Sequence, residues 1–285
     1  MPPMDSFTPQ PSFGKTLQSV LLHAVLIAAT AMTLFPLLWM LSVSLMAGDE
    51  ASRLPPPLLP ASPTLDHYRL LFRQMDLGRY AFNSVLVAGT ITALSLLLNS
   101  MAGYAFAKLR FRGRDRLFGW LLAGLVIPSQ SAMLPLFLML KGMGLTNTYA
   151  GVIVPGMASL FGIFLVRQYA LSIPDSLLDA ARIDGASEFR IYWSLVLPLC
   201  RPILATLALF TFMGAWNDFM WPLIILADSD RYTLPVALAN LLGEHVQDTE
   251  LMMAGAVLTV LPVVLLFLIL QKHYVEGLLL GSVKE

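Results

Sequence analysis

Side chains able to do acid–base, metal or redox chemistry are few and scattered in this sequence. The four histidines, His23, His67, His245 and His273, fall in different segments, and no two are spaced i,i+4. Because a protein metal site needs clustered donors, we expect none here. The single cysteine, Cys200, excludes an internal disulfide and is expected to be a small buried residue. No nucleophile stands beside a base in a catalytic pattern, so we predict no catalytic residue and no enzyme.

One short stretch invites a nucleotide-binding interpretation. Gly14-Lys15-Thr16 matches the end of the phosphate-binding loop G-x-x-x-x-G-K-[ST], but the position that needs the first glycine is Pro9. A long apolar stretch follows directly, and no strand pattern precedes it. We therefore expect that this chain does not itself bind ATP.

A carboxylate inside an apolar interval is the most unusual charged group. Asp218 lies in "GAWNDFMWPL", beside Asn217 and near Trp216 and Trp221. An intramembrane acid is costly and often marks a polar path. The same pattern also fits a hydrogen-bonded residue near the outer interface, with the tryptophans forming an interfacial belt. Both interpretations stay open.

The elements that carry these residues are apolar and long. The chain has 57% hydrophobic and 13% charged residues, against about 25% charged in an average soluble domain. About 20 apolar residues span a bilayer as a helix, which satisfies its own backbone hydrogen bonds in lipid. The first stretch is too long for a cleaved signal peptide, so we expect it to be retained. The sequence predicts an all-α integral membrane protein, one transmembrane domain over residues 1–285, with six transmembrane helices near 17–47, 80–107, 117–140, 145–168, 202–227 and 251–272.

Orientation follows from the cations. With six spans, twelve of the 18 Lys and Arg residues lie on the side that also holds both termini. The positive-inside rule makes that side cytoplasmic. The loop 108–116, "KLRFRGRDR", gives the clearest signal. The segments 49–79, 141–149 and 228–250 are then outside, as contacts for an external partner or as plain connectors. The net charge of zero gives no field that would attract nucleic acid.

A polar cytoplasmic loop, 175–197, interrupts the apolar pattern. Ser176-x-x-Asp179 fits a capping box that would start a helix near Ser176. Asp184-Gly185 is a turn signal, and Ser187 can cap a second helix with a stripe of Phe189, Tyr192/Trp193 and Val196. Two short amphipathic helices of this kind suit a groove on a partner, or a position flat on the lipid surface.

Resemblance to a known family adds to this interpretation. The pattern D-A-A-x-x-D-G-A, followed by L-P, resembles the "EAA" signature of permeases of binding-protein-dependent ABC importers. "GYAFAKLRFRGR" (103–114), "WNDFMWPL" (216–223) and the C-terminal "QKHYVEGLLLGSVKE" are similar to the carbohydrate branch and its maltose-type smaller permease subunit. One departure is Asp179, where the family usually has Glu. The resemblance covers nearly the whole chain and implies a type I importer permease fold. The residues it implies for ATPase coupling are Asp179, Ala180, Ala181, Asp184, Gly185, Ala186, Leu197 and Pro198.

The family also implies partners. These are a second permease subunit in a heterodimer, two cytoplasmic ATPase subunits that bind ATP and Mg, and an extracytoplasmic solute-binding protein. No cofactor is implied in this chain, which would lie in a bacterial cytoplasmic (inner) membrane and import a mono-, di- or oligosaccharide. Alternatives are import of sn-glycerol-3-phosphate or another small polar solute, or a stand-alone secondary carrier. The implied tail contact with the ATPases is Gly281, Ser282, Val283 and Lys284, and the candidate path residues are Trp216, Asn217 and Asp218.

Overall fold

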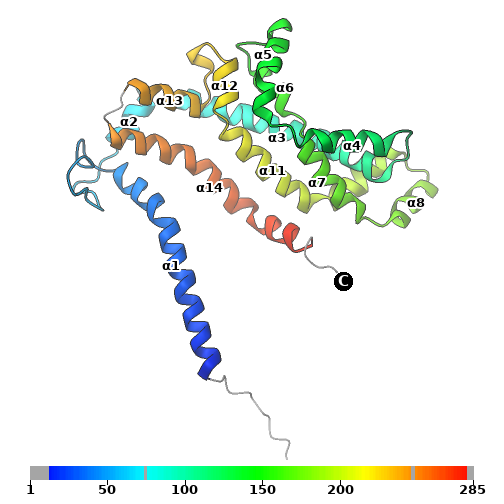
Figure 1. The fold of residues 1–285 in the computed structure, drawn as a ribbon, viewed down its shortest axis with the longest axis horizontal. Coiled ribbons are helices and arrows are strands. Elements are labelled where there is room, and N and C mark those ends of the chain that lie inside the picture. The colour runs from blue at the N-terminus through cyan, green and yellow to red at the C-terminus, as the bar shows by residue number, and fades with distance from the viewer. Residues whose placement is uncertain (1–12, 74–75, 245–247, 281–285) are drawn as a thin grey trace, which may run out of the picture. The chain divides into compact units, whose positions relative to one another are not determined.

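The protein is all-α in the part of the chain that the computed structural model describes, residues 13–73, 76–244 and 248–280 (Figure 1). No strand occurs within those ranges. The helices in the first part of the chain are α1 (Phe13–Val43), α2 (Asp66–Arg73), α3 (Leu77–Lys108), α4 (Arg114–Gly124), η1 (Ser129–Ala132), α5 (Met133–Gly142), α6 (Tyr149–Gly156) and α7 (Leu160–Leu171). They are followed by α8 (Asp175–Ile183), α9 (Glu188–Ile191), η2 (Tyr192–Val196), α10 (Leu197–Leu199), α11 (Arg201–Trp216), α12 (Met220–Ile225), η3 (Ser229–Arg231), α13 (Leu234–Glu244) and α14 (Thr249–Leu280).

Within the residues that the structure describes, four helical stretches are long and apolar enough to cross a membrane, and two bent helix pairs raise the total to as many as six. The four stretches are Gln18–Val43, Leu77–Lys108, Tyr149–Leu171 and Thr249–Ile269. The bent pairs overlap the spans expected over 117–140 and 202–227, and prolines within or near those spans, including Pro128, predict kinks there. The first is broken by 97° between Gly124 and Ser129, before which Pro128 lacks the N–H that a continuing helix needs. In the second, a bend of 78° falls between Leu199 and Arg201, and the helix ends at Trp216.

The chain folds into two compact units. The first comprises Met1–Arg69 and Gln247–Val257. Two buried carboxylates organise its irregular segment after α1. Glu50 accepts a hydrogen bond from the Ala61 backbone N–H at 2.8 Å, and Glu250 accepts one from that of Ala51 at 2.9 Å. These charge-assisted bonds hold a loop that has no regular secondary structure of its own.

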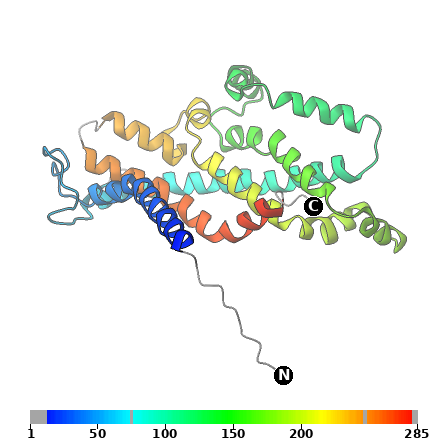
Figure 2. The same ribbon diagram turned by 60° about the horizontal axis from the view of Figure 1, so that its bottom comes forward.

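The second unit, Leu70–Val246 with Leu258–Glu285, is built on α3. Helices α7 and α11 pack along α3, as Figures 1 and 2 show. The buried residues of α3 recur every three or four positions, including Val87, Ile91, Ser95 and Asn99, as expected for one buried face of a helix. Small residues allow the close approach: a Cβ on Gly103 would lie 2.8 Å from the Val166 side chain.

Asn99 fixes α3 to the start of α7. Its side chain is fully buried, its Oδ1 accepts from the Ser159 backbone N–H at 3.0 Å, and its Nδ2 donates to Ser95 Oγ at 2.6 Å. Ser159 in turn caps α7 by accepting from the Gly162 N–H at 2.9 Å. A polar group satisfied in this way within apolar surroundings fixes the register of two helices.

Gly162→Ala should therefore destabilise the second unit. The added Cβ would lie 2.4 Å from Asn99 Nδ2 and 2.7 Å from Ser159 Oγ, so the helix pair must separate or the cap must break. Overpacking of this kind costs about 1–3 kcal/mol. The thermal midpoint of the purified chain in detergent should fall, whereas Gly214→Ala, where a Cβ meets nothing within 4 Å, should leave it unchanged or raise it. An unchanged midpoint for Gly162→Ala would show that α3 and the start of α7 can accommodate the added Cβ without loss of stability.

Candidate functional site

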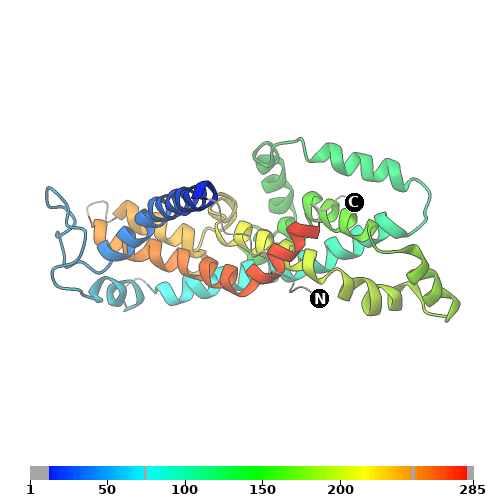
Figure 3. The same cartoon turned by 90° about the horizontal axis from the view of Figure 1, so that it is seen from below.

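The polar loop between α7 and α11 forms an elbow, residues 175–199, at the end of the second unit where α3 finishes. Figures 1 and 3 show α8 at this end and α12 and α13 at the opposite end. Helix α8 leads into a tight turn, and α9, η2 and α10 lead back toward α11. The loop expected as a bent helix pair is thus a structured element.

The first helix of the elbow starts differently from the expectation. Its N-cap is Pro174, which makes no side-chain capping bond, so the capping box from Ser176 to Asp179 does not form. The helix already begins at Asp175, which places Ser176 inside the first turn. Asp179 instead pairs with Arg182 at 2.7 Å, one turn along the same helix. The expected role of Asp179 in local capping is therefore wrong.

The turn at Gly185 does form as expected. Its φ of 82° is left-handed, a region that glycine occupies without the steric penalty of a Cβ. The Ala186 N–H donates to Ala181 O at 3.0 Å and the Gly185 N–H to Arg182 O at 3.0 Å, which is the Schellman pattern. Ser187 then caps α9 by accepting from the Arg190 N–H at 3.3 Å, also as expected.

A π-helical turn, η2, changes the phase of the second amphipathic stripe. Ile191, Tyr192 and Val196 are buried, whereas Phe189 is 62% exposed and packs edge-on against Trp193. The expected stripe thus holds for Tyr192 and Val196 and fails for Phe189. A π turn holds one residue more than an α turn, so residues before and after it cannot share one regular stripe.

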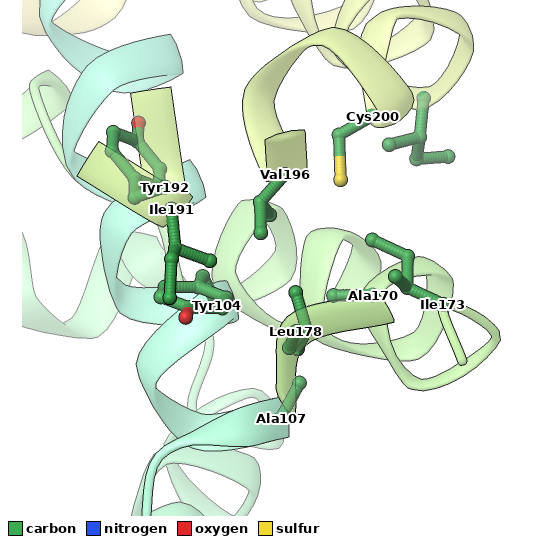
Figure 4. Close-up of a cluster of buried hydrophobic side chains, with 10 residues drawn as sticks. Tyr104, Ala107, Ala170, Ile173, Leu178, Ile191, Tyr192, Val196 and Cys200 are labelled. Carbon is green, nitrogen blue, oxygen red and sulfur yellow. The ribbon is translucent and has the colours of Figure 1, made fainter. Parts of the chain in front are cut away.

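An apolar cluster beneath the elbow joins it to α3 and α7 (Figure 4). Leu178 of α8 and Ile191 of α9 are each only 1% exposed, and Cys200 is buried among them as an apolar residue, as expected. The Tyr192 hydroxyl shares a hydrogen bond of 2.7 Å with Ser100 Oγ of α3. The buried members of this cluster are Tyr104, Ala107, Ala170, Ile173, Leu178, Ile191, Tyr192, Val196, Cys200 and Ile203.

A charged network closes the elbow across its turn. Arg182 Nε donates to Glu188 Oε1 at 2.7 Å, so the guanidinium bridges α8 and α9 as well as pairing with Asp179. The other carboxylate oxygen of Glu188 accepts from the Tyr104 hydroxyl of α3 at 2.7 Å. The two carboxylates raise the pKa of Arg182 above its usual value, with Glu188 the larger contributor. Sequence analysis missed Tyr104 and Glu188, because they are 84 residues apart and no local pattern links them.

A buried lysine anchors the start of the elbow. The Lys108 side chain, the last of α3, is 7% exposed, donates to Ile173 O at 2.6 Å and pairs with Asp175 at 2.7 Å. Hydrogen bonding and the charge of Lys108 hold the pKa of Asp175 below its ordinary value. The pair therefore persists at neutral pH, and its contribution to stability is lost only as the pH falls through the lowered pKa of Asp175.

Asp175→Asn should reveal this pH dependence. At neutral pH the variant should melt slightly below the wild type, because Lys108 loses its charged partner while keeping its carbonyl contacts. Below the ordinary aspartate value of about 3.9 the two curves should converge as Asp175 becomes protonated. The check is the thermal midpoint of both proteins from neutral pH down through the lowered pKa of Asp175, the range in which the contribution of the pair is lost. If the difference in thermal midpoint between the two proteins increased as the pH fell, the assigned role of the Lys108–Asp175 pair would be contradicted.

The outer face of the elbow carries half of the eight residues implied for coupling. Asp179, Ala180, Asp184 and Gly185 are exposed, while the remaining four are partly buried. Two apolar side chains stand at the tip: Ile183, which the sequence analysis did not select, is 87% exposed, and Phe189, selected only as part of the apolar stripe, is 62% exposed. Isolated apolar residues in a polar loop were the signal that could have identified them, since exposed apolar surface often marks a contact site.

The candidate path residues lie elsewhere, at the break between α11 and α12. Trp216 is buried and donates from Nε1 to Thr259 O at 2.9 Å, and Asn217 Nδ2 donates back to Met213 O at 2.9 Å. Asp218 Oδ1 accepts from the Trp221 N–H at 3.2 Å, so its carboxylate caps the first turn of α12. These contacts are structural and leave the path role open. The tail residues Gly281–Lys284 fall outside the described residues.

No group of three or more His, Cys, Asp and Glu side chains gathers in metal-binding geometry anywhere in the described ranges. The candidate site is a set of contacts: a rigid elbow tied to α3, and an exposed tip.

Comparison with known proteins identifies the class. The model of the protein family described as "Binding-protein-dependent transport system inner membrane component" matches residues 99–279 of this chain. That range includes the elbow and α11. The chain belongs to this family of membrane permeases.

Relatives with sugar-transport names match over nearly the whole chain. The arabinooligosaccharides transport system permease protein AraQ of Halalkalibacterium halodurans is 40% identical over 253 residues, 88% of this chain and 91% of that protein. The lactose transport system permease protein LacG of Rhizobium radiobacter is 33% identical, covering 95% of this chain and 98% of its own length. The diacetylchitobiose uptake system permease protein NgcG of Streptomyces coelicolor is 33% identical, covering 92% and 86%.

The fold also matches a solved structure. A chain in the crystal structure of a bacterial ABC transporter involved in the import of the acidic polysaccharide alginate superposes with a TM-score of 0.81. The match covers 94% of this chain and 100% of that chain at 24% sequence identity. The expected all-α importer permease fold is thereby confirmed.

Proposed function

We propose that this chain is a transmembrane subunit of an ATP-driven importer of a carbohydrate. The observation that carries the proposal is the set of whole-length relatives at 33–40% identity that are named as permeases for oligosaccharides or disaccharides. The chain would form the pathway together with a second permease, and it would take the sugar from an extracytoplasmic binding protein. ATP and Mg would be bound by two partner ATPase subunits.

The elbow is the proposed contact with one ATPase subunit. Its exposed tip offers Ile183 and Phe189 to a groove, and its Schellman turn holds the angle between α8 and α9. Tyr104, Lys108 and Ser100 connect the elbow to the end of α3 through hydrogen bonds. A movement of the ATPase would then reach the membrane helices as a rigid-body displacement, because the packed elements between them cannot deform smoothly.

The predicted orientation of the chain in the membrane agrees with a contact between the elbow and a cytoplasmic ATPase subunit. The cation count supports a cytoplasmic position for the elbow, the loop 108–116 and both termini, with the chain in a bacterial inner membrane. We further propose that residues 281–284 extend toward the ATPases. Helix α1 exposes an apolar surface along most of its length, including Met32 at 81%, which suits burial in lipid or against the second permease.

A reconstituted transporter tests the proposal. The chain is co-expressed with candidate ATPase, permease and binding-protein subunits, and uptake into ATP-loaded proteoliposomes is measured over a panel of mono-, di- and oligosaccharides. We expect uptake that needs both ATP and the binding protein. Uptake by the chain alone along an ion gradient would instead indicate a stand-alone carrier.

A different small polar solute is the second candidate. One relative, the osmoprotective compounds uptake permease protein GgtD of Synechocystis, is 34% identical over 224 residues, 78% of this chain and 75% of its own length. The panel should therefore include compatible solutes and sn-glycerol-3-phosphate. Binding-protein-dependent uptake of one of these, without sugar uptake, would replace the carbohydrate assignment.

Asp218→Asn should separate the two interpretations of this residue. Asparagine keeps an oxygen that can accept from the Trp221 N–H, so the start of α12 and the assembly of the complex should be preserved. If Asp218 faces the solute path, uptake should fall about tenfold or more, as expected when a polar contact in the membrane is lost. Uptake and assembly that both remain at wild-type levels would assign Asp218 to capping alone.

A further inference from the structure

The turn between the second and third apolar segments carries an arginine-rich surface that the coupling mechanism does not use. We define the arginine loop as residues 109–116; it connects α3, which ends at Lys108, to α4, which begins at Arg114. Both neighbouring segments are candidate membrane spans, so the loop lies where a bilayer changes from hydrocarbon to headgroups. Its only acidic residue is Asp115.

The loop is held in one shape by its own contacts. Gly113 takes a left-handed φ of 85°, and Arg114 is occupied within the loop, donating to Asp115 at 3.0 Å and to Leu109 O at 3.3 Å. The Phe111 ring lies 5.8 Å from that of Phe106 on α3. A surface fixed in this way loses little conformational entropy when it binds a ligand.

Three further arginines are presented to the outside. Arg110, Arg112 and Arg116 are exposed, and among the described residues none of them takes part in an ion pair. Guanidinium groups bind phosphate through paired N–H donors, and three of them around one turn create a strongly anion-attracting surface.

Apolar side chains adjoin this charge on the same helix face. On α4, Arg116 and Trp120 are spaced i,i+4 and therefore lie one above the other, and Trp120 is 77% exposed. Leu117 is 52% exposed beside them. A cationic group directly followed by exposed apolar surface complements a molecule that has a phosphate at one end and a hydrocarbon chain at the other.

We propose that the arginine loop is a binding site for the headgroup of an anionic phospholipid, with the acyl chain lying along Trp120. A soluble phosphate compound would satisfy the arginines but would leave Trp120 and Leu117 unmatched. An acidic protein surface would have to reach into the headgroup layer between two apolar segments. The lipid alone fits both the charge and the apolar surface.

Native mass spectrometry of the full-length chain tests the site. The chain is released from nanodiscs of phosphatidylcholine and phosphatidylglycerol, and the retained lipid is identified. Arg112→Gln with Arg116→Gln should weaken phosphatidylglycerol retention about 30-fold, since each cation near a headgroup contributes roughly 1 kcal/mol. Replacing both residues with Lys should preserve most of the retention because the charge is kept.

Matched controls make the outcome decisive. Arg53 and Arg73 are also exposed and without an ion pair in the described structure, and they lie in the segment between α1 and α3. Arg53→Gln with Arg73→Gln should leave retention unchanged, and soluble glycerol phosphate should not displace the lipid. Equal losses in both double variants, no loss in either, or displacement by glycerol phosphate would each overturn the site. Unaltered thermal midpoints of the variants exclude misfolding as the cause of lost lipid retention. If the variants lost a co-purifying acidic protein instead of lipid, the loop would be assigned to a protein partner.

Discussion

Gly185→Val should abolish most ATP-driven uptake while the chain still inserts and folds. A φ of 82°, as at Gly185, raises the conformational free energy of an L-residue by about 1–2 kcal/mol. For a β-branched residue such as valine the increase lies at the upper end of that range. The angle between α8 and α9 would then relax, and the tip formed by Ile183 and Phe189 would move away from its partner. A cost of about 2 kcal/mol lowers the ratio of native to relaxed elbows about 30-fold, so uptake should fall by up to that factor.

The controls for this prediction use the geometry of the turn. A Cβ at Gly185 meets nothing within 4 Å, so the effect arises from backbone conformation and not from a clash. Gly185→Asn should keep much of the activity, because Asn tolerates the left-handed region. Gly78→Val, at an exposed helical position that also has open space, should transport normally. Normal uptake by Gly185→Val would remove the turn from the coupling mechanism.

Charge reversal at the Arg182–Glu188 pair should have the second large effect. Arg182→Glu places a third carboxylate beside Asp179 and Glu188, and the repulsion should open the elbow. The two side chains are 35% and 45% exposed, so solvent screening limits the pair itself to about 1 kcal/mol. We expect uptake to fall about tenfold for each single reversal, because a displaced elbow loses its fit as well as its pair.

Restoring the pair is the critical comparison. Arg182→Glu combined with Glu188→Arg should recover part of the lost uptake, and the double-mutant cycle should give a coupling of about 1 kcal/mol. The reversed pair Asp66→Arg with Arg69→Asp provides the control, since its side chains are 71% and 66% exposed and far from the elbow in sequence. If the double variant is no better than the worse single variant, the bridge between α8 and α9 does not set the elbow angle.

Local sequence patterns predicted the elements of the elbow well. The glycine turn and the Ser187 cap each depend on a few adjacent residues, and both are present. The failed Ser176 cap shows where local reasoning stops: the helix start is set by Asp175 and its contact with Lys108, which lies 67 residues earlier. Prolines such as Pro128 predicted that some apolar segments would be kinked, but they did not predict the angle of each bend, because that angle depends on packing as much as on proline.

The contacts that connect the elbow to the membrane helices could not be predicted from one sequence. Tyr104 and Ser100 look like ordinary members of an apolar span, and only the fold brings them to Glu188 and Tyr192. The resemblance to a permease family located the elbow and named its exposed residues. It did not identify the side chains that hold the elbow in place.

The π-helical turn at η2 has a consequence for how the elbow is aimed. A π turn amounts to one inserted residue in an α-helix, and each residue of an α-helix turns the chain by about 100°. Deleting a single residue from Tyr192–Val196 would restore regular winding and swing α9 by about that angle relative to α10. The direction in which the elbow points therefore depends on the number of residues in this turn. An insertion or deletion of one residue could redirect the elbow toward a differently shaped ATPase in one evolutionary step.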